Sequence, residues 1–272
     1  MIKSPLRYPG GKSKAVKFLR NYFPEFSEFR EPFLGGASVA FYIAQEHKDK
    51  KIITSDLNYE LYCFWNVLKN DPKKLVREVQ KIFNKKNNGR ELFQTILKRR
   101  NNNLTEVQRS VDFFILNRIT FSGVVDSGGY SEASFQNRFT QSSIDRLLKA
   151  APIVARMNIF NNDYKKLINK KGNDVFIFFD PPYRSCTSSK LYGKKGILHQ
   201  QFDHELFFNS VSKSEHKWLI TYDNSEYISE LYKDFFQVEW ELQYGMNNYK
   251  QKNAARGKEL LIANYDITKM NK

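Results

Sequence analysis

The residues best suited to chemistry are Asp180-Pro181-Pro182-Tyr183, which follow a short apolar run. A carboxylate accepts hydrogen bonds, and a proline offers its carbonyl oxygen while its ring stiffens the chain. Two acceptors on a rigid turn fit an amino group with two hydrogens, and the tyrosine adds an aromatic face. The tetrapeptide therefore suits a flat heteroaromatic ring with an exocyclic amine, such as adenine. The alternative is a proline-rich turn in which Asp180 caps a local segment.

The element that must position the tetrapeptide is the run of residues 175–179. This run is short, β-branched and aromatic, and two prolines stop it, so it predicts a buried strand. The first proline also keeps Asp180 out of the helical region. Because ligands of an open α/β sheet bind beyond the carboxyl ends of its strands, we expect Asp180 to lie at a binding site.

Two further turns predict a site for a nucleoside-type ligand. Residues 29–42 read as a short strand, a small-residue turn around Phe33 and Gly35, and an apolar helix, so a ligand can approach the backbone there. A second strand, 52–55, ends at Asp56, about 20 residues beyond the turn, a spacing that places a carboxylate on ribose hydroxyls. The turn lacks the G-x-G-x-x-G fingerprint, which argues against a nicotinamide cofactor. The alternative is two unrelated loops.

Near the N-terminus, Gly10-Gly11-Lys12-Ser13 is similar to a phosphate-binding loop. A Walker motif needs a further glycine where this chain has Leu6, and no strand precedes the segment, so we set a nucleoside triphosphatase aside. We expect a glycine turn that starts a helix over 13–22 and presents Tyr8 and Lys12 beside it. An ordinary helix start is the alternative.

The charge balance indicates a polyanionic partner. The 272 residues carry 44 Lys and Arg against 29 Asp and Glu, a net charge of +15, and such a surplus is typical of nucleic-acid binding. The surplus is densest over 61–150, where 16 Lys and Arg stand against 8 Asp and Glu. Apolar residues at helical spacing predict several helices in the same region. The alternative is a basic soluble protein that is rich in Lys and Asn throughout.

A loop inside this helical region, 117–131, carries side chains that suit contacts with base edges. Its paired glycines predict a tight hairpin or loop. The last two predicted strands, 238–244 and 259–264, enclose a second, basic loop. Residues of the two loops are assigned to DNA: Asn117, Arg118, Ser122, Tyr130, Lys252 and Arg256. A mobile surface loop is the alternative.

Cysteine and histidine usage argues against a disulfide framework and against a metal site. Only Cys63 and Cys186 are present, far apart, together with 4 His. The first residues hold no apolar run of signal-peptide length, and no stretch is long enough to span a membrane, so we expect a cytoplasmic protein.

The order of these segments resembles that of the Dam-type (D12 class) adenine-N6 DNA methyltransferases over nearly the whole chain. In that family a glycine-lysine segment precedes an E-P-F-x-G turn, a helical target-recognition region and D-P-P-Y. The matching pieces are Tyr8-Pro9-Gly10-Gly11-Lys12, Glu31-Pro32-Phe33-Leu34-Gly35, Ser55-Asp56-Leu57-Asn58, Leu116-Asn117-Arg118, Asp180-Pro181-Pro182-Tyr183 and Lys258-Glu259-Leu260-Leu261.

The resemblance implies an α/β fold, namely a Rossmann-like, S-adenosylmethionine-dependent methyltransferase sheet with a mostly helical target-recognition insertion. The catalytic domain would be discontinuous, over 1–60 and 151–272, and target recognition would occupy 61–150. The implied cofactor is S-adenosylmethionine and the implied substrate is double-stranded DNA. A cognate restriction endonuclease is a candidate partner, and the oligomeric state is left open.

The resemblance also implies roles for single residues. The cofactor site would be formed by Tyr8, Lys12, Phe33, Gly35, Asp56, Asp163 and Asp180. Of these, Asp56 would hold the ribose hydroxyls and Asp163 would accept from the cofactor's adenine amine. The target adenine would be flipped out of the duplex and stack on Tyr183. Asp180 and the Pro181 carbonyl would accept its two N6 hydrogens, which frees the nitrogen lone pair for methyl transfer.

The chain departs from the family in two places. Ala37 stands where the second glycine of F-x-G-x-G is usual, and the loop 121–130 lacks the residues of GATC-specific members, so no recognition sequence is assigned. Related enzymes with N-P-P-Y or S-P-P-Y act on cytosine N4 or a protein glutamine, and Asp180 favours adenine over these. The sequence is also compatible with RNA as the target and with a catalytically inactive DNA-binding protein.

Overall fold

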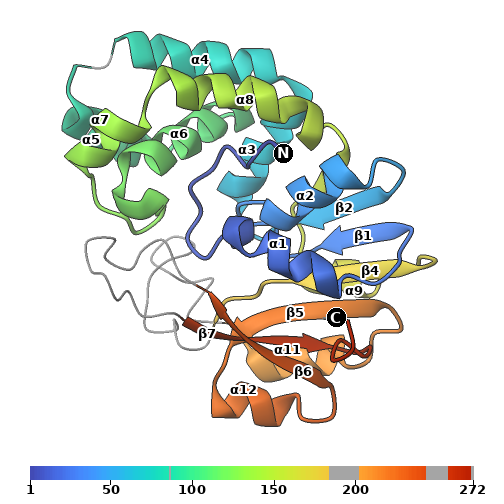
Figure 1. Ribbon diagram of the computed structural model, residues 1–272. Helices are drawn as coiled ribbons and strands as arrows, with labels where there is room; N and C mark the ends of the chain where they lie inside the picture. Colours follow the sequence, from blue (N-terminus) through green and yellow to red (C-terminus); the bar gives the residue numbers. More distant parts are fainter. Residues whose placement is uncertain (86, 184–201, 243–256, 271–272) are drawn as a thin grey trace.

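A computed structural model describes residues 1–85, 87–183, 202–242 and 257–270 (Figure 1). These residues form a seven-stranded sheet in the order β3-β2-β1-β4-β5-β7-β6. The strand bounds are β1 (Glu28–Glu31), β2 (Lys51–Ser55), β3 (Met157–Phe160), β4 (Val175–Phe179), β5 (Lys217–Asp223), β6 (Phe236–Leu242) and β7 (Gly257–Ala263). The expected α/β fold with a methyltransferase-like sheet is confirmed.

The direction of the strands determines where a ligand can bind. Strands β3, β2, β1, β4 and β5 run parallel, and β7 runs antiparallel to both β5 and β6. The chain order reverses between β1 and β4, and such a switch point opens a crevice beyond the carboxyl ends of the strands. The turn that starts at Pro32 and the tetrapeptide that starts at Asp180 follow these two strands, so they flank the same crevice.

Strand β4 is apolar throughout because both faces of the sheet are covered. Phe176 and Phe178 pack in one core, with helices α2 (Ser38–Glu46) and α3 (Tyr59–Asn70). The alternate residues Val175, Ile177 and Phe179 pack in a second core, with α9 (Tyr164–Ile168), α11 (His204–Val211) and α12 (Glu226–Leu231). The tetrapeptide is thereby attached to the most deeply buried strand.

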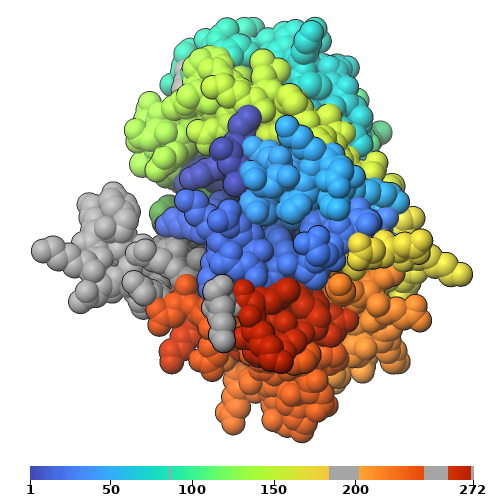
Figure 2. All heavy atoms as spheres, turned by 45° about the vertical axis from the view of Figure 1, so that its right-hand side comes forward, coloured from blue at the N-terminus to red at the C-terminus, as the bar shows by residue number. Residues whose placement is uncertain are grey.

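The helices after β2 gather on one side of the molecule, opposite β5 to β7 (Figure 1). They are α3, α4 (Pro72–Asn84), α5 (Gly89–Arg99), α6 (Glu106–Ile119), the short 3-10 helix η3 (Phe121–Gly123), α7 (Glu132–Arg138) and α8 (Gln141–Val154). Figure 2 shows the N-terminal residues, in blue, at the surface between this helical part and the C-terminal strands. The N-terminal segment is therefore placed to touch both parts of the molecule.

The N-terminal helix differs from its prediction. In place of one helix over 13–22, the chain forms three short turns, which are η1 (Lys12–Lys14), α1 (Val16–Leu19) and η2 (Arg20–Tyr22). Gly10 has a φ of 69° and the Gly11 amide donates to the Tyr8 carbonyl, so the expected glycine turn precedes them. The turn directs Lys12 inward, where its side chain is 3% exposed.

Candidate active site

The tetrapeptide is held in place through the carboxylate of Asp180. The Lys12 ammonium lies 2.7 Å from Asp180 Oδ1 and also donates to the Gly10 carbonyl at 3.1 Å. Thr221, on β5, donates to the same Oδ1 at 2.8 Å. Among the described residues, Oδ2 of Asp180 accepts no hydrogen bond, so this oxygen is available to an incoming N–H group.

The side chain of Tyr183 is hydrogen-bonded to β7, in the antiparallel part of the sheet. Its hydroxyl donates a hydrogen bond of 2.6 Å to Glu259 Oε2, on β7. Burial, followed by the nearby charges of Asp180 and Glu259, raises the pKa of Tyr183 well above its usual value, so the phenol stays protonated and acts as the donor. The expected aromatic face therefore lies beside the carboxylate in a fixed position.

The glycine turn after β1 is closed over by Tyr8. Gly35 has a φ of 46°, and a Cβ added at Gly35 or Gly36 would lie 2.9 or 2.7 Å from Tyr8 side-chain atoms. Two hydrogen bonds also hold the turn in place. The Gly35 amide donates to Asp56 Oδ2 at 2.9 Å, and Trp65 Nε1 donates to the Gly35 carbonyl at 3.0 Å. Glycine is needed here for backbone conformation and for space.

Ala37 keeps the turn in the shape that glycine would adopt. Its φ of 57° and ψ of 30° are left-handed, and it directly precedes α2 as the N-cap residue. The methyl group is fully buried. Ala37 therefore holds a left-handed conformation that favours glycine, and the turn carries strain at this residue.

Acidic residues lie at or beyond the carboxyl ends of the neighbouring strands: Glu31 ends β1, Asp56 follows β2 and Asp163 follows β3. Burial raises the pKa of Asp56 to about 6, although the backbone N–H groups of Gly35 and Asn58 lower it. Burial likewise raises the pKa of Glu31 well above its usual value. Asp163 follows β3 and caps α9, accepting from the Lys165 amide at 2.9 Å. Acceptors at the ends of β2 and β3 fit the hydroxyl and amino groups of an adenosine.

Phe33 follows β1 and packs among other aromatic side chains. Its ring stacks on Tyr164 at 5.6 Å and contacts Phe202 and Phe207, both at 5.7 Å. Phe33 is half-buried. The structure thus brings Tyr8, Lys12, Phe33, Gly35, Asp56, Asp163 and Asp180 to the ends of β1 to β4 or onto the adjoining N-terminal segment.

Asn117, which the sequence assigns to DNA contact, lies in the interior of the folded chain. Asn117 is fully buried, and its amide nitrogen donates to the carbonyls of Arg7 (2.6 Å) and Gly123 (3.0 Å). Its side-chain oxygen accepts from the Arg7 amide at 3.0 Å. These bonds join the N-terminal segment to the loop after α6, so Asn117 positions that loop.

Arg118 is buried without a carboxylate among the described residues. Its side chain is 3% exposed, and its Nε has no hydrogen-bond partner there. The guanidinium lies 5.2 Å from the Phe114 ring centroid. Burial, together with repulsion from Arg7, Arg146 and Arg138, lowers the pKa of Arg118 to about 9. A buried, uncompensated cation beside other cations is a ready site for an anion.

The loop after α6 presents the other assigned side chains at the surface. Ser122 is half-exposed with a φ of 53°, and an isolated bridge pairs Thr120 with Tyr130. Tyr130 is partly committed to packing, since Arg90 lies 5.2 Å from its ring centroid. Phe121, which the sequence reasoning missed, is 68% exposed at the tip of this loop. An aromatic residue between a helix end and a glycine was the signal for it.

Thr221 and Glu259 were also missed as site residues. Thr221 lies near the end of an apolar strand, and Glu259 is an isolated acid in the run 258–263. A charged residue on an inward-facing position of a strand is the available signal. Lys252 and Arg256 lie outside the described residues.

Two negative findings concern the described residues alone. They contain no group of three or more His, Cys, Asp and Glu side chains arranged to hold a metal ion. Their helices include none that is both long and apolar enough to cross a membrane.

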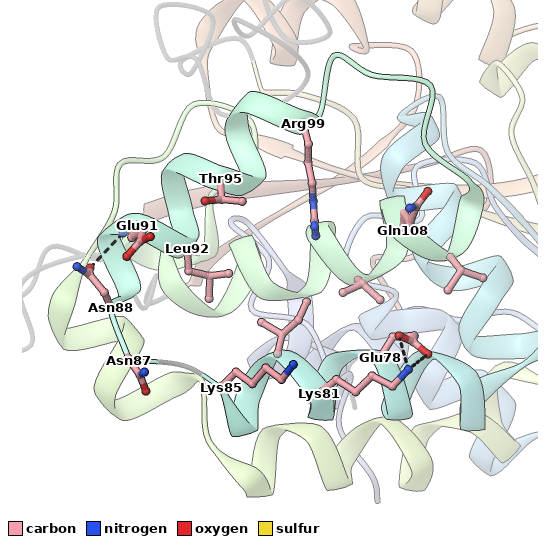
Figure 3. Close-up of a pocket in the computed structure, with 13 residues that line it drawn as sticks. Glu78, Lys81, Lys85, Asn87, Asn88, Glu91, Leu92, Thr95, Arg99 and Gln108 are labelled. Atoms are coloured by element: carbon pink, nitrogen blue, oxygen red, sulfur yellow. Dashed lines mark hydrogen bonds and ion pairs between the residues drawn. The ribbon is translucent and has the colours of Figure 1, made fainter.

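A cavity of about 660 Å³ lies away from this crevice, in the helical part between α4, α5 and α6 (Figure 3). Its rim is polar, with Lys81, Lys85, Glu91 and Arg99. Arg99 forms an ion pair with Asp112, on α6. None of the predicted site residues lines it, so the cavity is no candidate for the active site.

The comparisons agree with the geometry. A model of the D12 class N6 adenine-specific DNA methyltransferase family matches residues 8–246. The type II methyltransferase M.MjaIII of Methanocaldococcus jannaschii is 24% identical, over 97% of this chain and 99% of its own. A DNA adenine methylase of Vibrio cholerae is 28% identical, over 68% of this chain and 66% of its own. The type II methyltransferase M1.LlaDCHI of Lactococcus lactis subsp. cremoris is 23% identical, over 95% of this chain and 94% of its own.

Proposed function

Because the chain belongs to the D12 class of N6 adenine-specific DNA methyltransferases, we propose that it methylates N6 of an adenine flipped out of double-stranded DNA at one short sequence. S-adenosylmethionine is the methyl donor in this proposal. One observation carries it. The carboxylate of Asp180 and the ring of Tyr183 follow β4, and the glycine turn at Gly35 follows β1, so both lie at the switch point of the sheet.

The cofactor would lie along the ends of β1, β2 and β3. Asp56 would accept from its ribose hydroxyls and Asp163 from its adenine amine, while Tyr8 and Phe33 would border it. A carboxylate has about four acceptor positions, so Asp56 keeps capacity beyond the two backbone N–H groups of Gly35 and Asn58 that it already binds. When bound, S-adenosylmethionine supplies an activated sulfonium methyl group.

The chain's own residues would make the target nitrogen reactive. The N6 lone pair of adenine is delocalised into the ring, so the amine is a poor nucleophile. Asp180 Oδ2 accepts one N6 hydrogen and the Pro181 carbonyl accepts the other, which favours a tetrahedral nitrogen with a free lone pair. When the bond from N6 to the methyl carbon forms, N6 loses the proton that it shares with the Asp180 carboxylate, and the product is a neutral methylated base. Tyr183 stacks on the ring and holds it in line with the methyl group. Positioning of this kind supplies much of the catalysis.

DNA binding would be shared between the helical part and the N-terminal segment. We assign target recognition to 61–150 and catalysis to 1–60 and 151–272. Arg118 would receive a backbone phosphate, with Arg7, Arg138 and Arg146 adding positive potential around it. Ser122 and Phe121 extend from the loop that Asn117 positions, where they can contact bases. Members of this family named as type II methyltransferases suggest a restriction endonuclease as a further partner.

The deciding experiment is transfer of radiolabelled methyl from S-adenosylmethionine to unmethylated genomic DNA, with single-molecule sequencing of the product. N6-methyladenine in one short sequence context is the expected result. Label that enters RNA or protein, with none in DNA, would overturn the proposal. Absence of incorporation into any of the three would also overturn it.

The variant Asp180→Asn tests the role of the charged acceptor at this position. Asparagine keeps the shape and a side-chain oxygen toward Lys12 and Thr221 but removes the charged acceptor. We expect kcat to fall by roughly 100-fold or more, with unchanged affinity for DNA because the basic surplus lies elsewhere. An equal loss of DNA affinity and activity would argue against the role given to Asp180.

A further inference from the structure

Glu259 is a buried acid that the proposed reaction does not use. It lies on β7, between two other strands of the sheet, where it pairs with Asp223 on β5 and with Trp240 on β6. Only 1% of it is exposed, and the strand continues through the buried residues 260–263. Burying a carboxyl group among apolar strands disfavours folding, so packing alone does not account for its presence.

The side chain of Glu259 is directed at the catalytic turn. Its Oε2 lies 2.6 Å from the hydroxyl of Tyr183, which is the geometry of a strong hydrogen bond to a carboxylate. This contact bridges 76 positions of the chain and joins the antiparallel end of the sheet to the residues after β4. Glu259 thereby holds the end of the Tyr183 side chain that is farthest from the backbone.

Two other groups locate the same ring. The Lys12 ammonium lies 4.9 Å from the Tyr183 ring centroid, and the Tyr222 ring lies 5.9 Å away at an interplanar angle of 42°. These contacts restrict the ring, and the hydrogen bond from its hydroxyl holds the far end of the side chain. Because a phenol O–H prefers to lie in the plane of its ring, the direction of this bond also favours one ring plane. Stacking on an aromatic base depends on the plane of the ring, and catalytic geometry tolerates errors of only about 10–20°.

We propose that Glu259 is a positioning residue for adenine methylation: by accepting the hydrogen bond of Tyr183 it fixes the plane of the ring on which the flipped adenine stacks. This inference rests on the proposed function. It predicts that Glu259 acts on the methyl-transfer step only through Tyr183. It also predicts that the acceptor atom at Glu259 matters more than the negative charge.

The charges around Glu259 agree with a role that needs an acceptor. The pKa of Glu259 is raised to about 7, chiefly by burial; Lys12 and the Tyr183 hydrogen bond lower it, and the charges of Asp180 and Asp223 contribute to the rise. Either protonation state offers an oxygen to Tyr183. Glutamine has the same shape and a side-chain oxygen, so Glu259→Gln preserves the acceptor and Glu259→Leu removes it.

The test is a double-mutant cycle on the full-length enzyme, made from E259L, Y183F and the double variant, with E259Q as the conservative control. We expect E259L to lower kcat by about 10- to 100-fold, while the KM for DNA and the DNA affinity stay unchanged. E259Q should stay near wild type. In the Y183F background E259L should have no further effect, because the bond is already absent.

A duplex with 2-aminopurine at the target position gives a second readout. Stacking quenches 2-aminopurine, so a flipped base that has lost its ordered stack on Tyr183 should fluoresce more strongly with E259L than with wild type. Losses that add in the cycle, or wild-type kcat and fluorescence for E259L, would overturn the inference. If E259L does not fold, Y183F alone must show the same loss of kcat and the same bright fluorescence, and wild-type behaviour of Y183F would overturn the inference.

Failure of this inference is distinguishable from failure of the proposed function. Wild-type enzyme that transfers methyl groups to adenine upholds the function whatever the variants do. Wild-type enzyme that transfers none to DNA removes the premise, and the inference falls with it.

Discussion

Ala37 is one of the non-glycine residues at which this chain strains its own backbone. Its left-handed φ of 57° costs an L-amino acid about 1–2 kcal/mol, whereas glycine adopts it freely but loses about 0.5–1 kcal/mol of chain entropy on folding. We therefore expect Ala37→Gly to raise the free energy of unfolding by about 0.5–1 kcal/mol. Urea unfolding of both proteins measures this.

Ala44 provides the matched control for that prediction. It is buried in the interior of the same helix, α2, where the backbone is right-handed. Ala44→Gly should lower the free energy of unfolding by about 1 kcal/mol. If both glycine variants destabilise the protein to a similar extent, the strain assigned to Ala37 is absent.

At the scale of elements, helix α6 shows why a local pattern can misplace the end of a helix. The sequence assigns residues 117–131 to a loop, which puts Asn117 in that loop as a base contact. The helix continues to Ile119, because Thr120 bonds back to Leu116 and Asn117 is held by Arg7, 110 positions away. A helix end that depends on such distant partners cannot be read from neighbouring residues.

The other elements differ in how well the sequence predicts them. The strand 175–179 was predicted with the bounds that it has, because it is a short apolar run between two aspartates. Helices α7 and α8 were missed, since α7 is short and polar and α8 contains Pro152. The site motifs were predictable as motifs. The contacts that join them, Lys12 to Asp180 and Tyr183 to Glu259, were not, because only the folded sheet brings them together.

The DNA-binding role proposed for Arg118, on α6, can be separated from a structural role by measurements of stability. It is a buried cation with no carboxylate among the described residues, so replacing it with an apolar side chain of similar size should not destabilise the protein. We expect Arg118→Met to weaken DNA binding and to reduce the slope of log affinity against log salt by about 1. Fluorescence anisotropy at several salt concentrations measures the slope.

Arg109, on the same helix, is the control for Arg118. Its guanidinium forms an ion pair with Glu60, so it already has a partner within the chain. Arg109→Met should lower stability and leave the salt slope of DNA binding unchanged. A salt slope for R118M equal to that of wild type, together with lower stability, would make Arg118 a structural residue.

Across the whole molecule, charge is separated by sign. The chain carries a surplus of 15 positive charges, densest over 61–150, yet the crevice at the switch point gathers Glu31, Asp56, Asp180 and Glu259. Within the described residues of that crevice, Lys12 is the cation that pairs with one of these acids. A basic surface suits a polyanion, and an acidic crevice suits a cofactor that carries a sulfonium and an ammonium group.

The acidic crevice also predicts how stability depends on pH. A carboxyl group whose pKa is higher in the folded protein binds its proton more tightly there than in the unfolded chain, so stability falls as pH rises between the two pKa values. For Glu259 this window runs from 4.5 to about 7. Glu259→Gln removes its contribution, which amounts to about 3 kcal/mol at most, since one pKa unit corresponds to about 1.4 kcal/mol.

We therefore expect the stability of wild type relative to E259Q to decrease as pH rises from 4.5 to about 7, and to stay constant above that. Asp56 and Glu31 titrate with the same sign in both proteins, so the comparison cancels them. Urea unfolding of the ligand-free proteins across this range measures the difference. If the free energies of unfolding of the two proteins changed in parallel with pH, the Glu259 carboxyl would be as well solvated in the folded protein as in the unfolded chain. Its burial between β5 and β6 argues against that outcome.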